Sequence, residues 1–394
     1  MQIAFFTNNY LPVTNGVVRS VSTFRKTFTR MGHNVFVFAQ EDDVEDQDPF
    51  IFRYPSLPLP VPVDIAAAIP ISPNIDWLLP HLKLDVIHTH HPVLLGSVAA
   101  HKARRMDLPL VFTFHTQYHE YTHYFPLPQE AVQEFLKEAV YDYMRAYMHR
   151  CHHIVVPSES MLALLLRDYG LETNYTVVPT GIDLQPYQDA EGSLIREKHG
   201  WGEDTLMISV GRLAKEKNWQ FLLRSASEVM QDRKDFRLVI LGEGPERKNL
   251  QEYADELGIR RWVDFIGQVS FEQVPAYLKA ADLFGFASTT ETQGLVTLEA
   301  LAAGLPVVAV DASGTRDIVR SGVQGFLVPE DEAAFSQAVA NLIDHPETYQ
   351  QFKQAALARA ADFEISAMAQ LLLEVYQLAA EEHQAENFVR VADS

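Results

Sequence analysis

The chain has 394 residues, of which 47% are hydrophobic and 21% charged, so it is long enough for two ordinary α/β cores and has the composition of a globular protein. Its net charge of −20 argues against a general nucleic-acid binder, because phosphate contacts need clustered Lys and Arg. The only cysteine, Cys151, excludes an internal disulfide. We expect a cytoplasmic protein, because residues 1–10 do not form a signal peptide and no run of 18 apolar residues is present.

The N-terminal segment reads as a strand, a helix and a second strand. Residues 3–6 are a short apolar run ended by polar residues, which is typical of a buried parallel strand. Apolar residues then recur at helical spacing over 17–31, and Gly32 is placed to end that helix. The next strand is predicted over 35–39. This order is the beginning of a doubly wound sheet.

The rest of the first half continues this pattern after an interruption. Residues 55–80 hold seven prolines, which excludes a long helix or a central strand there. A helix is predicted over 129–150. Further strands are predicted over 85–90, 109–114 and 152–157, and residues 177–183 end this half.

The pattern then starts again, so we predict an α/β protein of two Rossmann-like domains with boundaries at 1–183 and 184–365. A helix is predicted over 218–230. Strands are predicted over 206–210, 238–241, 263–266, 283–287, 307–310 and 326–328. Ligands of such sheets bind outside the carboxyl ends of the strands, so the ligand is expected in a cleft between the halves.

The most informative stretch runs from Glu291 through Gly294 to Glu299. A strand end passes through a glycine-containing turn into a helix, whose first N–H groups at 294–296 can hold a phosphate. The two glutamates are eight residues apart and Glu291 precedes the helix, so they are two separate contacts and no acid/base pair. A capped surface helix with ordinary acids is the alternative.

A second stretch, Gly211 to Asn218, places Arg212 and Lys217 just past the end of a strand. Cations there stabilise the negative charge that develops on a diphosphate leaving group. Taken alone, the stretch also fits a solvated basic turn. Both stretches follow strand ends in the same half, which favours a shared site.

These motifs resemble those of retaining glycosyltransferases of family 4. The resemblance rests on Gly-Arg-(x4)-Lys-Asn at 211–218 and on Glu-(x7)-Glu at 291–299 followed by Ala-Leu-Ala-Ala-Gly-Leu-Pro. It extends to residues 6–17, 177–183 and 241–245, and so covers nearly the whole chain. It implies the GT-B architecture, in which two Rossmann-like domains face each other across a deep cleft. It also implies that a C-terminal helix at about 366–384 packs back on the N-terminal domain, after which 386–394 reads as a loose tail.

The resemblance assigns roles to matching residues. Arg212 and Lys217 are implied to hold the donor diphosphate, and Glu291 and His115 to contact the transferred sugar. Gly16 lets the first loop approach the donor phosphate, where a Cβ would intrude. The remaining donor-binding residues are implied to be Val269 near the base, Glu299 at the ribose, and Gln293, Gly294, Leu295 and Val296 at the sugar and phosphates.

The acceptor is expected to meet the N-terminal half. The run from Phe114 that includes Tyr118 and Tyr121 is similar to the branch that glucosylates diacylglycerol, so we expect UDP-glucose as donor and diacylglycerol or a glycolipid as acceptor; GDP-mannose stays open. Weak peripheral contact with the inner face of the plasma membrane is expected, although the helix at 129–150 lacks the strong basic character of lipid-using relatives. Lys102 and Arg105 are an alternative anion site for a soluble sugar phosphate.

Neither a cofactor nor a metal is expected. His88 and His90 share a strand face and precede His91, but no cysteine or carboxylate cluster completes a site in sequence. The glycine pair Gly242 and Gly244 lacks the third glycine of a dinucleotide fingerprint. Two other functions remain open on the same architecture: an isomerase or phosphorylase, and a catalytically silent sugar-nucleotide binder.

Overall fold

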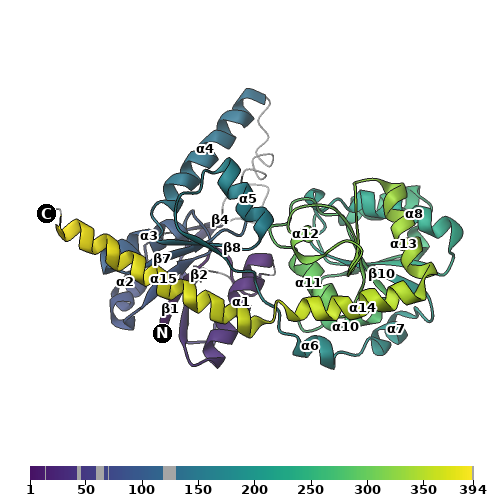
Figure 1. Ribbon diagram of the computed structural model, residues 1–394, viewed down its shortest axis with the longest axis horizontal. Coiled ribbons are helices and arrows are strands. Elements are labelled where there is room, and N and C mark those ends of the chain that lie inside the picture. Colours follow the sequence, from purple (N-terminus) through teal and green to yellow (C-terminus); the bar gives the residue numbers. More distant parts are fainter. Residues whose placement is uncertain (14, 42–45, 59–65, 70, 119–129, 393–394) are drawn as a thin grey trace. The chain divides into compact units, whose positions relative to one another are not determined.

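A computed structural model describes residues 1–13, 15–41, 46–58, 66–69, 71–118 and 130–392 (Figure 1). The chain forms two compact units. One comprises Met1–Gly181 with Ile365–Ser394, and the other comprises Ile182–Glu364. The expected boundary after residue 183 lies two residues from the observed one.

The N-terminal unit is built on a seven-stranded sheet in which every paired neighbour is parallel, with the order β3-β2-β1-β6-β7-β8-β9. Its strands are β1 (Gln2–Phe6), β2 (Asn34–Gln40), β3 (Ile51–Tyr54), β6 (Val86–Thr89), β7 (Leu110–Thr113), β8 (His153–Val156) and β9 (Tyr175–Val177). Its helices are α1 (Gly16–Arg30), α2 (Pro73–Leu78), α3 (Leu95–Met106), α4 (Glu130–Met148), α5 (Glu159–Asp168) and α15 (Ile365–Ala392), with the 3-10 turn η1 (Leu79–Leu82).

The local sequence explains these elements. The central strands β1, β6 and β7 are almost fully buried because helices cover both faces of the sheet. β1 and β7 are mostly apolar, whereas β6 also buries His88 and Thr89. Helix α1 begins where the Asn15 side chain accepts a hydrogen bond from the Val18 N–H, and Gly32 follows its end with φ +87°. Among the described residues of the proline-rich stretch, the regular elements are α2, η1 and the short antiparallel pair β4 (Ser56–Pro58) and β5 (Ala66–Ala68). Strand β3 at the sheet edge, with α3 and α5, was not predicted.

The C-terminal helix differs from its prediction. Helix α15 extends from Ile365 to Ala392, so residues 386–392 of the segment expected as a loose tail are helical. Polar contacts hold its second half to the N-terminal unit: the Glu382 carboxylate lies 3.1 Å from His153 Nδ1, and Asn387 donates to Asp107 at 3.0 Å. Its first half buries Tyr376 and neighbouring apolar residues in the core shared with β1 and α1. The helix thus belongs to the N-terminal unit.

The C-terminal unit has a six-stranded sheet, again parallel at every pairing, with the order β12-β11-β10-β13-β14-β15. Its strands are β10 (Thr205–Val210), β11 (Phe236–Leu241), β12 (Val263–Gly267), β13 (Leu283–Phe286), β14 (Val307–Val310) and β15 (Gly325–Val328). Its helices are α6 (Gln185–Asp189), α7 (Ser193–His199), α8 (Trp219–Asp232), α9 (Arg247–Glu256), α10 (Val274–Ala280), α11 (Leu295–Ala302), α12 (Thr315–Ile318), α13 (Glu332–Asp344) and α14 (Pro346–Ala361), with 3-10 turns η3 (Lys215–Lys217) and η4 (Arg260–Trp262).

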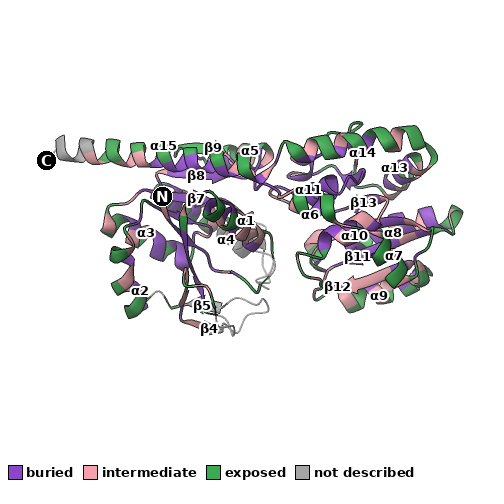
Figure 2. Ribbon diagram, turned by 90° about the horizontal axis from the view of Figure 1, so that it is seen from below, coloured by how far each residue is buried: buried purple, intermediate pink, exposed green. Residues whose placement is uncertain are grey.

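Figure 2 shows the strands of both sheets as mostly buried and the outer sides of the covering helices as exposed. In the N-terminal unit β1 lies between β2 and β6, and in the C-terminal unit β10 lies between β11 and β13. This is the doubly wound arrangement. The strand order therefore reverses between β1 and β6 in one unit and between β10 and β13 in the other. Ligands of such folds bind at the carboxyl ends of the strands beside this reversal.

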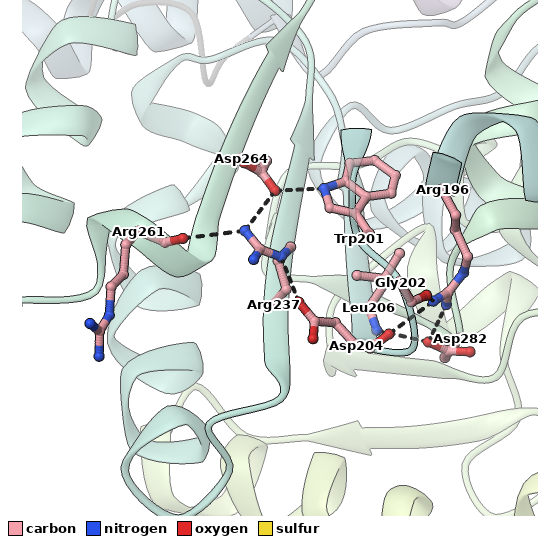
Figure 3. Close-up of polar contacts among 9 residues, drawn as sticks. All are labelled: Arg196, Trp201, Gly202, Asp204, Leu206, Arg237, Arg261, Asp264 and Asp282. Atoms are coloured by element: carbon pink, nitrogen blue, oxygen red, sulfur yellow. Dashed lines mark hydrogen bonds and ion pairs between the residues drawn. The ribbon is translucent and has the colours of Figure 1, made fainter. Parts of the chain in front are cut away.

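A polar network occupies the opposite, amino-terminal edge of the second sheet (Figure 3). Arg196 donates to Asp282 at 2.7 Å and to the carbonyl of Asp204 at 3.0 Å, and Asp282 also accepts from the Leu206 N–H at 2.8 Å. Arg237 links Asp204 to Asp264. These bonds connect the residues that precede β10 and β13. The network lies at the amino-terminal edge and so does not involve the carboxyl edge of the sheet.

Candidate functional site

Two predicted charges meet at the reversal point of the C-terminal sheet. Lys217 lies in the loop after β10, and Glu291 lies in the loop after β13, the strand beside it. The Lys217 ammonium donates to Glu291 Oε1 at 2.5 Å, and both side chains are largely buried. Burial alone would raise the pKa of Glu291, but the charge and hydrogen bond of Lys217 outweigh it and hold that pKa below its usual value. The carboxylate is therefore ionised.

The loop that carries Arg212 is fixed by its backbone. The Arg212 carbonyl accepts a hydrogen bond from the indole of Trp219 at 2.9 Å. A Cβ at Gly242 would lie 1.9 Å from the Gly211 carbonyl oxygen, and one at Gly244 would lie 2.4 Å from that of Leu213. These glycines let two loops touch, which explains why the pair occurs without a dinucleotide fingerprint.

The Arg212 side chain itself is exposed, and within the described ranges its guanidinium makes no ion pair or hydrogen bond with another side chain. A planar cation that is held by a rigid loop and has no internal counter-ion suits a phosphate ligand.

The helix that follows Glu291 begins as the sequence predicted. Gly294 stands immediately before α11 with φ +78°, which favours glycine, and Leu295 and Val296 open the helix. The N–H groups at the first positions of a helix have no intrahelical acceptor, so this end can bind an anion. A Cβ at Gly314 would lie 2.8 Å from Glu291 Cβ, so a second loop closes against Glu291.

The remaining donor residues occupy different environments in the same unit. Glu299 lies in the second turn of α11 and is 8% exposed, while Glu291 precedes the helix, as the spacing indicated. Gln293 is buried, and Val269 packs against the hydrophobic core beyond the end of β12.

In the N-terminal unit, His115 follows the end of β7. Its Nε2 lies 2.9 Å from Nδ1 of His90, which follows the end of the neighbouring strand β6. Gly16 is the exposed first residue of α1, where that helix presents its own free N–H groups. Tyr118 packs edge-on against Phe114 with ring centroids 5.7 Å apart, and Tyr121 lies outside the described residues.

The histidines of this edge are neutral. Burial lowers the pKa of His91 to about 4 and that of His88 to about 3. Burial, followed by repulsion from neighbouring histidines, also lowers the pKa values of His90 and His115. His88 bonds to Tyr376 at 2.8 Å and to Thr113 at 2.6 Å. In the described part of the chain, no group of three or more His, Cys, Asp or Glu is arranged to hold a metal.

The alternative anion site is not assembled near His115. Lys102 donates to Asp76 at 2.5 Å, so its charge is already paired. Arg105 lies in the last turn of α3, which runs from the carboxyl end of β6 back to the amino end of β7. Both residues therefore lie toward the edge of the sheet opposite His115, and we do not carry them into the proposed site.

Sequence reasoning missed three contributors: Gly314, the packing role of Gly244, and His90 as the partner of His115. The signal for His90 was present, because consecutive strands of a parallel sheet deliver the residues after them to one edge. The packing roles of the two glycines carried no local signal, because they depend on loops far apart in sequence.

Comparisons with known proteins identify the family of the chain. Residues 193–359 match the family described as Glycosyl transferases group 1, and residues 14–186 match Glycosyltransferase Family 4. The chain is 35% identical over 319 residues to an alpha-monoglucosyldiacylglycerol synthase of Streptococcus pneumoniae (strain ATCC BAA-255 / R6), covering 78% of this chain and 71% of the relative. It is 30% identical over 342 residues to an enzyme of the same name from Acholeplasma laidlawii, covering 84% of this chain and 86% of that one.

Among solved structures, HepE of Anabaena in complex with UDP aligns over 96% of this chain and 100% of its own, with a TM-score of 0.75 at 19% identity. The fold is therefore GT-B, built from two Rossmann-like domains with parallel sheets. No helix in the described ranges is both long and apolar enough to cross a bilayer. With both halves matched and relatives aligned over most of their length, the chain belongs to glycosyltransferase family 4 and is a hexosyltransferase.

Proposed function

We propose that the protein transfers glucose from UDP-glucose to a hydroxyl of diacylglycerol or a related glycolipid, with retention of configuration. The observation that carries the chemistry is the Lys217–Glu291 pair at the carboxyl edge of the C-terminal sheet, beside exposed Arg212 and the free start of α11. The two relatives named as alpha-monoglucosyldiacylglycerol synthases support the choice of sugar and acceptor. Because the sugar of UDP-glucose is α-linked, an α-linked product means retention.

The residues divide the work as follows. Arg212 and Lys217 neutralise the diphosphate as its charge grows, and the first N–H groups of α11 at Leu295 and Val296 bind its oxygens. Glu291 and His115 position the sugar. Lys217 is bonded to Glu291, so a bound diphosphate competes with Glu291 for the Lys217 ammonium.

The remaining donor contacts follow the same proposal. Gly16 at the start of α1 allows close approach of a phosphate, Glu299 binds the ribose, and Val269 lies beside the base. Gln293 and Gly294 complete the sugar contacts. Tyr118 and Tyr121 are proposed for the acceptor. The protein needs no cofactor or metal in this scheme, because protein cations and helix ends supply the charge.

The test is nucleotide release by the purified chain, which is given UDP-glucose with diacylglycerol in mixed micelles or with a panel of sugar phosphates. Release of UDP with the lipid only, and an α-linked glucolipid by NMR, is the expected result. Release with a sugar phosphate only would overturn the lipid acceptor. Nucleotide release from GDP-mannose but not from UDP-glucose would overturn the donor. UDP release without any acceptor would point to a hydrolase, UDP release that needs only inorganic phosphate to a phosphorylase, and conversion of the UDP-sugar without UDP release to an isomerase.

Membrane association belongs to the same proposal. The acceptor is a lipid, so the protein is proposed to act at the inner face of the plasma membrane through weak peripheral contact of its N-terminal unit. Sedimentation with vesicles that contain diacylglycerol tests this step separately from catalysis.

A further inference from the structure

Two histidines stand side by side at the carboxyl edge of the N-terminal sheet. His90 follows β6 and His115 follows β7, and these strands are hydrogen-bonded neighbours. Nδ1 of His90 lies 2.9 Å from Nε2 of His115, and the rings stack with centroids 5.2 Å apart and planes 26° apart. The contact is direct and specific to one nitrogen of each ring.

His90 is held more firmly than His115. It is 1% exposed, whereas His115 is half-buried. Its backbone N–H donates to the Phe6 carbonyl at 2.9 Å, and its ring meets Phe5 edge-on at 5.0 Å. The centroid of the His88 ring lies 4.3 Å from that of His90. His90 is therefore a rigid support, and His115 rests on it.

The position of the shared proton follows from the other nitrogen of His90. Within the described ranges, His90 Nε2 is buried and has no hydrogen-bond partner. A buried N–H without an acceptor costs more than a buried nitrogen lone pair without a donor. The His90 proton is therefore on Nδ1, from which it donates to His115 Nε2. His115 then carries its own proton on Nδ1.

Both rings stay neutral, so this arrangement persists at ordinary pH. Burial lowers the pKa of His90, and the neighbouring His88, His115 and His91 add to that effect. Burial lowers the pKa of His115 for the same reason. A third proton on the pair would place a charge among these rings at high cost.

We propose that His90 is a positioning residue that fixes the ring plane and the Nδ1–H tautomer of His115, the histidine proposed to contact the sugar. This inference rests on the proposed function, which places the sugar at His115. His90 itself touches no substrate. Its hydrogen bond determines which ring nitrogen of His115 carries the proton, as the hydrogen-bond partner of a metal-bound histidine does.

Matched substitutions of His90 test the proposal. In His90→Asn the side-chain amide nitrogen takes the place of Nδ1 and keeps a donor toward His115. In His90→Gln the side-chain amide nitrogen takes the place of Nε2 instead, so the donor toward His115 is lost. In His90→Leu no side-chain donor remains. We expect His90→Asn to keep kcat within about 3-fold, and the other two to lower kcat about 10- to 100-fold with little change in donor KM.

His88→Gln is the control, because His88 belongs to the same buried cluster but bonds to Tyr376 and Thr113. It should lower Tm and leave kcat unchanged. The proposal is wrong if all three His90 variants keep the wild-type kcat. It is also wrong if kcat falls only in proportion to the loss of Tm, in the His88 variant as in the His90 variants.

A second readout does not depend on activity. Nitrogen-15 NMR of labelled histidine distinguishes the two tautomers, and the His115 signals are assigned from their loss in His115→Ala. We expect the Nδ1–H form of His115 in the wild type and in His90→Asn, and a shift toward the Nε2–H form in His90→Gln. An Nε2–H form in the wild type overturns the inference even if sugar transfer is found. If no acceptor supports transfer, the proposed function fails, and the tautomer measurement still decides this inference.

Discussion

The carboxyl edges of the two sheets carry opposite kinds of polar chemistry. In the C-terminal unit, Lys217 and Glu291 are charged and satisfy each other at 2.5 Å. In the N-terminal unit, burial keeps His90 and His115 neutral, and Nδ1 of His90 lies 2.9 Å from Nε2 of His115. The same strand order thus supports two kinds of site, one suited to a charged diphosphate and one suited to neutral hydroxyl groups. The difference teaches that the fold positions the loops, and the residues after each strand decide the electrostatics.

Removing Glu291 gives the largest expected effect. Glu291→Ala should lower kcat by about 10²- to 10³-fold, because the sugar loses a charged contact near the reacting centre. UDP affinity, measured by calorimetry, should stay equal or become a few fold tighter, since Lys217 loses its internal partner. Asp344→Ala is the control, because it removes the partner of Arg233 at the opposite edge of the same unit. Loss of UDP binding that parallels the loss of kcat would contradict the placement of Glu291 at the sugar.

Removing Lys217 should damage binding and catalysis together. Lys217→Ala is expected to lower kcat/KM by about 10²-fold and to weaken UDP binding. It also leaves Glu291 without its cation, and because burial raises the pKa of that carboxyl, residual activity should fall as the pH is lowered in the variant more than in the wild type. A variant with normal UDP affinity would show that Lys217 serves Glu291 and not the diphosphate.

Acid should destabilise the N-terminal unit first. The folded-state pKa values of His88 and His91, about 3 and about 4, lie below the usual value of 6.5. Between pH 6.5 and these folded-state values, the unfolded chain therefore binds more protons than the folded chain. Stability conferred by these neutral rings is complete above pH 6.5 and is lost as the pH falls. Each ring removes about 1.4 kcal/mol of unfolding free energy per pH unit in that window.

Hydrogen exchange followed by mass spectrometry at pH 7 and pH 5 measures this loss separately in each unit. Protection should decrease in β6 and β7 before it decreases in β10 and β13. Equal loss in both units would show that the histidine cluster does not control acid stability.

The smallest effect is expected at Lys102 and Arg105. Lys102→Ala removes a largely buried ion pair with Asp76 and should cost about 1 kcal/mol of stability. Arg105→Ala should change stability less, and neither should alter transfer, because both residues lie toward the amino edge of the sheet. Thermal melts and the nucleotide-release assay check both. A specific loss of transfer to a sugar phosphate would restore these residues as an acceptor site.

Much of this architecture could be predicted from the pattern of residues. The apolar runs at 3–6 and 206–210 are strands within one residue of their predicted ends. Edge elements were harder to predict: β3 at Ile51–Tyr54 is half-buried and carries no continuous apolar run. The end of α15 was misjudged because residues 381–387 are almost all polar, and the contact of Asn387 with Asp107 lies across 280 residues of sequence.

The sequence by itself determined the two Rossmann-like halves, the loops that carry Arg212, Lys217, Glu291 and Gly294, and the family, because hydrophobic periodicity and turn residues are local properties. Only the tertiary structure decided that Lys217 meets Glu291, that Lys102 is paired with Asp76, and that His115 rests on His90. Those contacts depend on strand order, which brings together residues 74, 26 and 25 positions apart. Whether a charge is paired or a proton is shared follows from that proximity and from burial, and neither is a property of a local segment.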